Sequence, residues 1–234
     1  MISCLIYNIH FGRKLRDILE WVGREVPGRD VICFQEFPVD KLQFALGALA
    51  PFWYQYTYGT GFTKKGREYG QLTLYNPGKL KLTSATSLAL GKSYLDEKFF
   101  RNGGERSATV ARFIYKEKPL IIINTHLTCV ALNARRIHQV KKILAYLQML
   151  KVREKTPAVI LGDFNYSSIV RQRTLLRTME QYGFSNAYKL NTIRLLFVKH
   201  QVDYVFHKRC EVFDVHVKKV RYSDHFPVEF FLRC

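Results

Sequence analysis

The clearest structural signal in the chain is the stretch AVILGDFN, residues Ala158–Asn165, in which four consecutive apolar residues lead into a glycine, a carboxylate and an amide. An unbroken apolar run is typical of a strand that is buried on both faces of its sheet. Polar groups that follow such a strand lie at the edge where α/β folds place their reacting groups. We therefore predict a sheet covered on both sides, with Asp163 and Asn165 at its functional edge.

Five further segments place polar side chains in the same way, where an apolar run gives way to a loop. They are Tyr7–His10 (YNIH), Phe34–Glu36 (FQE), Asn124–Leu127 (NTHL), Val202–Tyr204 (VDY) and Ser223–Pro227 (SDHFP). Each of these short motifs is common by chance, but ordinary surface positions of polar residues do not explain the whole set. We expect them to come together at one edge of the fold.

Apolar residues at helical spacing between two apolar runs predict two β-α-β units. The units consist of residues Ile2–Tyr7, Leu15–Val26 and Val31–Phe34, and of residues Leu120–Asn124, Ile137–Leu147 and Ala158–Leu161. We predict a further helix around Leu175–Tyr182, and further strands over Trp53–Tyr58, Gln71–Tyr75, Leu80–Leu90, Thr109–Tyr115, Val202–Phe206, Val212–Val217 and Val228–Leu232.

Because these two units are similar halves of one chain, we predict an α/β (α+β) fold. We expect a four-layer α-β-β-α sandwich, in which two mixed sheets pack face to face and the helices lie outside. Residues 1–234 contain no low-complexity segment or linker, so we expect one catalytic domain.

The charge balance restricts the partners. There are 37 Lys and Arg against 19 Asp and Glu, a net charge of +18. Such a field attracts polyanions, so nucleic acid or an anionic membrane surface is the natural partner. The sequence has no apolar run of transmembrane length and no start typical of a signal peptide, and its five cysteines lack CxxC spacing. We therefore expect a cytoplasmic monomer with reduced thiols.

The polar edge would consist mainly of oxygen donors. Its candidate residues are Asn8, Glu36, His126, Asp163, Asn165, Asp203, Asp224 and His225. Carboxylates without clustered thiols or paired histidines suit Mg²⁺ or Mn²⁺ rather than structural zinc. Such a site favours hydrolysis of phosphoesters, which needs an oriented water and a cation on the charged oxygens.

In their order along the chain, these motifs resemble the endonuclease/exonuclease/phosphatase superfamily. This family includes pancreatic-type deoxyribonucleases, apurinic endonucleases, inositol polyphosphate 5-phosphatases and neutral sphingomyelinases. The resemblance spans residues 2 to 232 and implies metal-dependent attack of water on a phosphoester. By position, Glu36 resembles the principal metal ligand, with Asn8 beside it, and Asp224 would hold the metal or its water shell. His10 stands near Asn8, where some relatives carry a metal-binding aspartate, but we expect His10 to have an ordinary surface or packing role.

The resemblance also implies catalytic roles. Asp163 corresponds to the residue that orients or deprotonates the attacking water, and Asn165 would donate to the pentacovalent phosphate. His225 resembles the catalytic histidine, and Asp203 would fix its tautomer and favour the imidazolium. His126 would contact the scissile phosphate. Whether Asp163 or His225 takes the proton stays open at this point.

Basic residues in or near the loops of this edge are candidates for substrate binding. They are Arg67, Arg106, Arg135, Arg136, Arg171 and Arg173. The alternative for each is a solvated surface that only adds to solubility. The charge favours a Mg²⁺-dependent phosphodiesterase of nucleic acid, with a DNA endonuclease as our first hypothesis. The alternative is a phosphoinositide phosphatase or a sphingomyelinase-type hydrolase at an anionic membrane.

Overall fold

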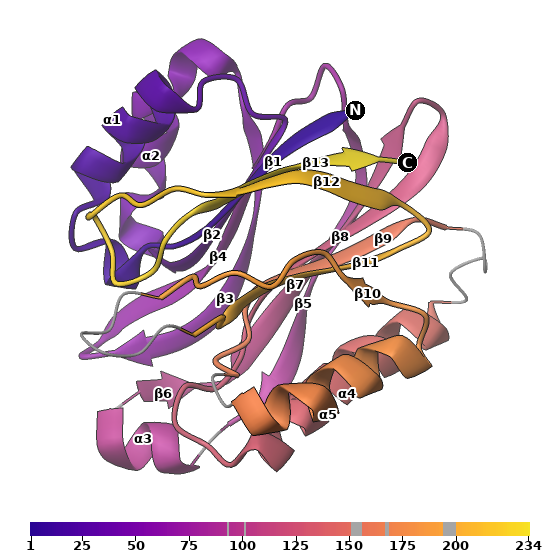
Figure 1. The fold of residues 1–234 in the computed structure, drawn as a ribbon. Helices are drawn as coiled ribbons and strands as arrows, with labels where there is room; N and C mark the ends of the chain where they lie inside the picture. Colours follow the sequence, from indigo (N-terminus) through magenta and orange to yellow (C-terminus); the bar gives the residue numbers. More distant parts are fainter. Residues whose placement is uncertain (93, 101, 151–155, 167–168, 194–199) are drawn as a thin grey trace.

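Two parallel β-α-β units form the centres of two sheets in the computed structural model, which describes residues 1–92, 94–100, 102–150, 156–166, 169–193 and 200–234 (Figure 1). The first unit consists of β1 (Ile2–Asn8), α1 (Leu15–Glu25) and β2 (Val31–Pro38). The second consists of β8 (Lys118–His126), α4 (Asn133–Met149) and β9 (Ala158–Asp163). Both predicted units are thus confirmed.

Antiparallel strands complete the sheets. They are β3 (Gln55–Lys64), β4 (Arg67–Tyr75), β5 (Lys81–Gly91), β6 (Asn102–Gly104), β7 (Arg106–Tyr115), β10 (Ser185–Asn186), β11 (Asp203–Lys208), β12 (Glu211–Val217) and β13 (Val228–Arg233). The first sheet has the order β12-β13-β1-β2-β4-β3-β6, and the second has the order β10-β11-β9-β8-β7-β5. The remaining helices are α2 (Leu42–Ala48), α3 (Tyr94–Phe100) and α5 (Ile169–Gln181). Single 3₁₀ turns span His10–Gly12, Val39–Lys41 and Ala50–Phe52.

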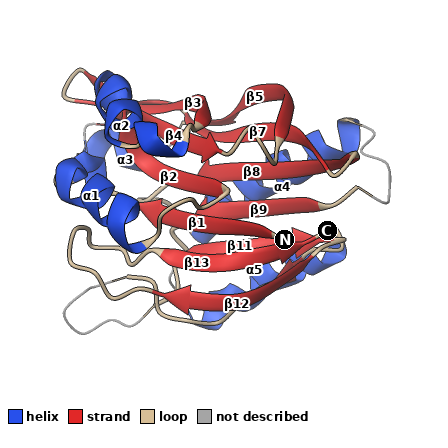
Figure 2. Ribbon diagram, turned by 90° about the horizontal axis from the view of Figure 1, so that it is seen from above, coloured by secondary structure: helices blue, strands red, loops and turns tan. Residues whose placement is uncertain are grey.

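The sheets face each other and the helices lie outside them, with α1 and α2 on one side and α4 and α5 on the other (Figure 1); Figure 2 looks down on the stacked sheets. Alternation along β8 explains this packing, because successive side chains of a strand point to opposite faces. Ile122 packs with Ile6 and Val159 between the sheets, whereas Ile121 and Ile123 pack with α4 and α5. Apolar residues are therefore needed at every position of the strand, and the predicted four-layer sandwich is confirmed.

The predicted strand over Trp53–Tyr58 begins too early. β3 starts at Gln55, while Trp53 has a left-handed backbone with φ 54° directly after the 3₁₀ turn Ala50–Phe52. The side chain of Trp53 is 83% exposed. Pro51 fits a tight turn and the left-handed residue ends it, so the aromatic content of this stretch does not place Trp53 in the core.

A pair of buried amides joins the two sheets. Gln35 Nε2 of β2 donates to Asn124 Oδ1 of β8 at 2.8 Å. Asn124 Nδ2 in turn lies 3.2 Å from the carbonyl oxygens of Phe34 and Leu72 and from Thr73 Oγ1. Gln35 and Asn124 are both fully buried, so water does not compete for these bonds. They fix how the second sheet sits on the first.

We expect Asn124→Ala to lower the free energy of unfolding by about 2–4 kcal/mol, because buried carbonyl groups lose their donor. Urea denaturation would measure this change. Asn191→Ala, at an exposed asparagine, is the matched control and should leave stability within about 0.5 kcal/mol of the unsubstituted protein. An equally small change in the free energy of unfolding for Asn124→Ala would contradict the role of the Gln35–Asn124 pair in joining the sheets.

Candidate active site

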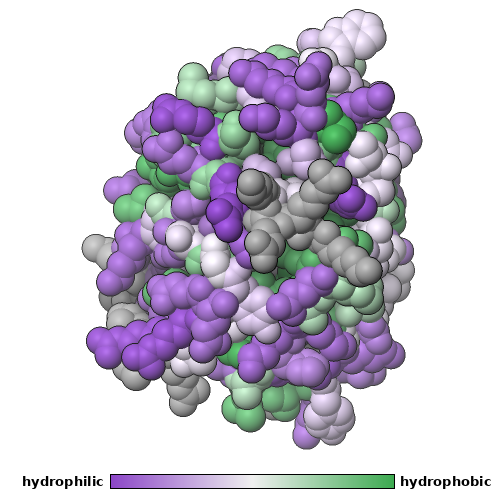
Figure 3. Space-filling view, turned by 90° about the vertical axis from the view of Figure 1, so that its right-hand side faces the viewer, coloured by the Kyte–Doolittle hydropathy of each residue, from purple (hydrophilic) through white to green (hydrophobic). Residues whose placement is uncertain are grey.

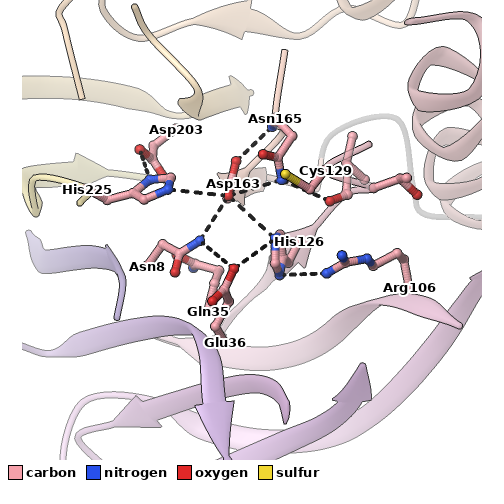
Figure 4. A network of polar contacts seen from close by, with 12 residues as sticks. Asn8, Gln35, Glu36, Arg106, His126, Cys129, Asp163, Asn165, Asp203 and His225 are labelled. Carbon is pink, nitrogen blue, oxygen red and sulfur yellow. Dashed lines mark hydrogen bonds and ion pairs between the residues drawn. The ribbon is translucent and has the colours of Figure 1, made fainter. Parts of the chain in front are cut away.

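The polar side chains converge where β1, β2, β8 and β9 end (Figure 4). Asn8, His126 and Asp163 are the last residues of β1, β8 and β9. Asp203 opens β11, and it pairs with Asp163 in the register of β9 and β11. His225 comes from the loop before β13. The convergence of the predicted motifs at one edge is therefore present in the structure.

Gly162 allows the close approach of β9 to β8 at this edge. Its φ is 125°, a backbone conformation that L side chains rarely adopt. A Cβ atom at this position would lie 2.1 Å from the carbonyl oxygen of Thr125. Only glycine therefore fits immediately before Asp163.

Glu36 lies in a bulge of β2, where the register with β4 shifts between Phe34 and Phe37. Its φ is 57°, a conformation that non-glycine residues seldom adopt and that costs free energy. A bulge re-aims a side chain, since it interrupts the regular alternation of the strand. Glu36 Oε2 accepts a hydrogen bond from the amide of Phe11 at 3.1 Å, while Oε1 lies 3.5 Å from Asn8 Nδ2.

Asp163 is the centre of the hydrogen-bond network. Its Oδ1 accepts from the amide of Asn165 at 2.7 Å. Its Oδ2 accepts from Asn8 Nδ2 at 2.9 Å and from Asn165 Nδ2 at 3.1 Å. Asn165 has a left-handed backbone, φ 49°, which turns the chain back over the carboxylate. The carboxylate is thus held by donors from both sheets.

His225 forms an ion pair with Asp203, with 2.9 Å between Nδ1 and Oδ2. Its Nε2 lies 3.8 Å from Asp163 Oδ2. Burial by itself would lower the pKa of His225, but the carboxylates of Asp203 and Asp163 outweigh burial and raise the pKa to about 10. His225 is therefore an imidazolium at neutral pH.

Burial raises the pKa of Asp163 to about 7, with a smaller contribution from the negative charge of Asp203, and burial also raises the pKa of Glu36. Raised carboxylate pKa values mean that the surrounding cations do not compensate these buried negative charges. A divalent cation would supply the missing charge, and the oxygen donors of Glu36 and Asp163 fit Mg²⁺ or Mn²⁺. The residues present therefore fit the metal that the fold implies.

Ligand atoms of Asp163, Asp203 and His225 also lie within 4.8 Å of one another. A protonated histidine cannot bind a metal. The imidazolium of His225 consequently favours a metal position on the Glu36 side of the site.

Asp224 lies at the rim of the site, with 42% of its side chain exposed. Its Oδ1 is 2.7 Å from His10 Nδ1 and 3.1 Å from Ser223 Oγ. Burial opposes ionisation of Asp224, but the bond from His10 and the charges of His225 and His10 lower its pKa to about 2. His10, for which we expected an ordinary role, is thus a direct partner of a predicted metal-site residue.

His126 and Arg106 are buried next to these carboxylates. His126 Nε2 lies 3.6 Å from Glu36 Oε1 and 3.5 Å from Asp163 Oδ2. Arg106 contacts the other face of the network, at His126 Nδ1, and forms a buried ion pair with Asp96. No sequence motif indicates Asp96, because its importance follows from a contact between α3 and β7.

The other predicted substrate-binding arginines have different surroundings. Arg67 forms a bidentate pair with Asp40, and Arg135 donates to the carbonyl oxygen of Lys92. Arg136 is buried and donates to Asn133 and to the carbonyl groups of Thr128, Cys129 and Ala131. Arg173 is exposed, and the side chain of Arg171 lies outside the described residues. We therefore assign Arg136 to the support of its loop and do not retain it as a phosphate ligand.

A family model described as the endonuclease/exonuclease/phosphatase family matches residues 5–225. The chain belongs to the endonuclease/exonuclease/phosphatase family. This match confirms the resemblance indicated by the motifs. Members of the family are phosphoester hydrolases. The comparison with curated proteins finds no match.

Solved structures show the same fold. A mannosyl-6-phosphatase from Bacteroides thetaiotaomicron has a TM-score of 0.72 and 18% identity, with 100% of both chains covered. TDP2 from D. rerio, complexed with a single-strand DNA product, has a TM-score of 0.74 and 13% identity, covering 100% of this chain and 99% of that one. The catalytic domain of human Nocturnin with bound sulfate has a TM-score of 0.75 and 19% identity, covering 99% of this chain and 94% of that one. At these identities the likeness shows the fold alone.

In protein without metal, the raised pKa of His225 has a consequence for stability. The folded-state pKa of about 10 exceeds the unfolded value of about 6.5, so the stabilisation is fully present below pH 6.5 and is lost as pH rises towards 10. We expect the stability difference between the unsubstituted protein and His225→Gln to shrink by at least about 1.4 kcal/mol over this range, the value of one pKa unit.

Urea denaturation in EDTA at pH 6, 8 and 9.5 would measure this difference. The same series for His138→Gln, at an exposed histidine of α4, serves as the control for the loss of a surface histidine. A constant difference for His225→Gln would show that His225 is not held as an imidazolium.

Proposed function

We propose that the protein is a metal-dependent phosphodiesterase that hydrolyses nucleic acid, with DNA as its first substrate. The imidazolium of His225, which lies 3.8 Å from the Asp163 carboxylate, carries the proposal for the reaction. The net charge of +18 supports a long polyanion as substrate. The similarity to a TDP2 structure that contains single-strand DNA agrees with this choice.

In this mechanism Asp163 orients the attacking water and takes its proton. In the protein without metal, burial raises the pKa of Asp163 to about 7, which suits a general base at neutral pH, whereas His225 is already protonated and has no free lone pair for this task. The amides of Asn8 and Asn165 hold Asp163 Oδ2 in place. We therefore propose Asp163 as the base, a choice that the motifs alone leave open.

His225 donates from Nε2 to a phosphate oxygen as negative charge develops there. Asp203 keeps the ring oriented through Nδ1, and its charge stabilises the imidazolium. Asn165 Nδ2 donates one of its two protons to Asp163 Oδ2. It also binds the carbonyl oxygen of Leu127 at 3.0 Å, which limits its rotation.

Mg²⁺ or Mn²⁺ would be held by Glu36, with Asn8 beside it and Asp224 near the water shell. When bound, it would neutralise charge on the phosphate oxygens and on the leaving group. His10 forms an ion pair with Asp224 and would therefore orient this carboxylate before a metal binds.

Phospholipid hydrolysis is the second candidate, because the same positive charge suits an anionic membrane. No helix in the described part of the chain is long and apolar enough to span a membrane. On the face shown in Figure 3, hydrophilic side chains predominate and apolar ones are scattered among them. We place nucleic acid first because the net charge of +18 suits a long polyanion.

We expect Mg²⁺-dependent nicking of supercoiled plasmid that falls about tenfold or more between 50 and 200 mM salt, because phosphate contacts release counterions. Single-stranded DNA, RNA and phosphoinositide vesicles would be assayed in parallel, each with Mg²⁺ or with EDTA. Release of phosphate from the vesicles without nicking would replace the nuclease with the phospholipid hydrolase. Hydrolysis of none of these substrates would refute both.

His225→Ala should lower the nicking rate by about 10² to 10⁴-fold, the range for a positioned acid–base group. The surface variant His138→Ala should retain full activity. Circular dichroism would show that both variants are folded. Normal activity of His225→Ala would overturn the mechanism and leave the substrate question open.

Metal binding should also stabilise the protein. At an Mg²⁺ concentration of 100 times the dissociation constant, we expect a gain of about 2.7 kcal/mol, seen as a higher melting temperature. Glu36→Gln removes a charge that the metal needs and should lose most of this gain. Glu97→Gln, on α3, is the control and should respond to Mg²⁺ as the unsubstituted protein does.

A further inference from the structure

His126 has a cation at one ring nitrogen and two carboxylates near the other (Figure 4). Arg106 Nη1 lies 3.2 Å from Nδ1. On the opposite side of the ring, Nε2 faces Glu36 Oε1 at 3.6 Å and Asp163 Oδ2 at 3.5 Å. His126 and Arg106 are 1% and 4% exposed, so water does not separate these groups.

The chemistry of the guanidinium determines which ring nitrogen carries the proton. Arginine has only donors and keeps its charge in proteins. Nδ1 of His126 must therefore accept from Arg106, and the proton of the neutral ring is on Nε2. A second ring proton would place two N–H groups against each other beside a buried cation.

Arg106 is itself held by Asp96 and by the ring of Phe62. Its Nε and Nη2 donate to Asp96 Oδ2 at 3.1 Å and 2.8 Å. Asp96 Oδ1 accepts from the amide of Val130 at 2.7 Å, which fixes the carboxylate to the loop after β8. The guanidinium carbon lies 4.2 Å from the ring centroid of Phe62, a cation–π distance. The orientation of the guanidinium is therefore set before any substrate binds.

Nε2 of His126 is buried, and no hydrogen-bond partner for it occurs among the described residues. Both carboxylate oxygens lie beyond normal hydrogen-bond length. A buried donor without an acceptor costs free energy, which a bound acceptor would recover. A phosphate oxygen that approaches Nε2 from beside the carboxylates would be such an acceptor.

We propose that Arg106, oriented by Asp96, is a positioning residue that sets the tautomer of His126. His126 thus enters the reaction as a neutral donor through Nε2–H, and it acts neither as a base nor as a metal ligand. The catalytic part of this inference rests on the proposed hydrolysis of a phosphoester. The tautomer itself is a property of the protein without substrate.

Nitrogen NMR of ¹⁵N-histidine-labelled protein in EDTA tests the tautomer directly. His126→Gln identifies the signals. We expect a protonated Nε2 and an unprotonated Nδ1 in the unsubstituted protein. A proton on Nδ1, or on both nitrogens, overturns the proposal without any activity measurement.

Variants of Arg106 test what sets the tautomer. Arg106→Lys keeps a charged donor for Nδ1 and should keep the NMR pattern, whereas loss of the two bonds to Asp96 and of the contact with Phe62 should lower kcat by up to about tenfold. Arg106→Met removes the donor, so we expect the single neutral pattern to be lost and kcat to fall about 10 to 100-fold with little change in KM. Arg112→Met, at an exposed arginine of the same strand, is the control and should change neither quantity.

A normal NMR pattern together with normal kcat in Arg106→Met would refute the role of Arg106. Should Arg106→Met fail to fold, Arg106→Lys still decides, because loss of the pattern while a donor is present contradicts the proposal. Absence of hydrolysis of every substrate in the panel would refute the proposed function, whereas the NMR spectra would still confirm or refute the tautomer.

Discussion

The hydrogen bond between Gln35 and Asn124 is the constraint on which the site depends, because the reacting groups come from two different sheets. Asn124 and His126 are two residues apart on β8, so both side chains point towards the first sheet. Gln35 already points towards the second sheet, and regular alternation would turn its neighbour Glu36 away. The bulge with φ 57° at Glu36 reverses this and brings its carboxylate within 3.6 Å of His126. A buried amide pair and one strained residue thus place the two halves of the site.

Burial then determines the electrostatics. The core that stabilises the sandwich also removes water from the strand ends, where carboxylates from both sheets meet. His225 compensates Asp203, and Asp96 takes up the charge of Arg106. Asp163 and Glu36 are left with raised pKa values. The uncompensated negative charge makes a cation favourable at this edge, and burial raises the pKa of Asp163 to about 7 in the protein without metal.

Much of the fold follows from local sequence. Unbroken apolar runs predict strands buried on both faces, and the long apolar stripes of α1 and α4 predict helices. Helices α2 and α3 have seven residues each, too few for the helical period to repeat clearly. The motifs indicate Glu36, Asp163 and His225, but they contain no sign of the left-handed bulge or of the contacts of His10 and Asp96. The bulge and these contacts depend on chain segments that are far apart in the sequence. The roles of the arginines are equally hard to predict, because each role depends on a partner that the local sequence does not identify.

The partners of the arginines also bear on how the proposed nuclease would recognise its substrate. Arg67 is paired with Asp40, Arg106 with Asp96, and Arg136 with carbonyl groups of its loop. These cations already have partners within the protein, so most of the attraction for a polyanion would come from the summed field of +18 charges. A field of this kind attracts the phosphate backbone equally whatever the base sequence, so it does not discriminate between bases. Selectivity would then arise close to the scissile phosphate, where His126 and His225 each offer one N–H from a fixed ring.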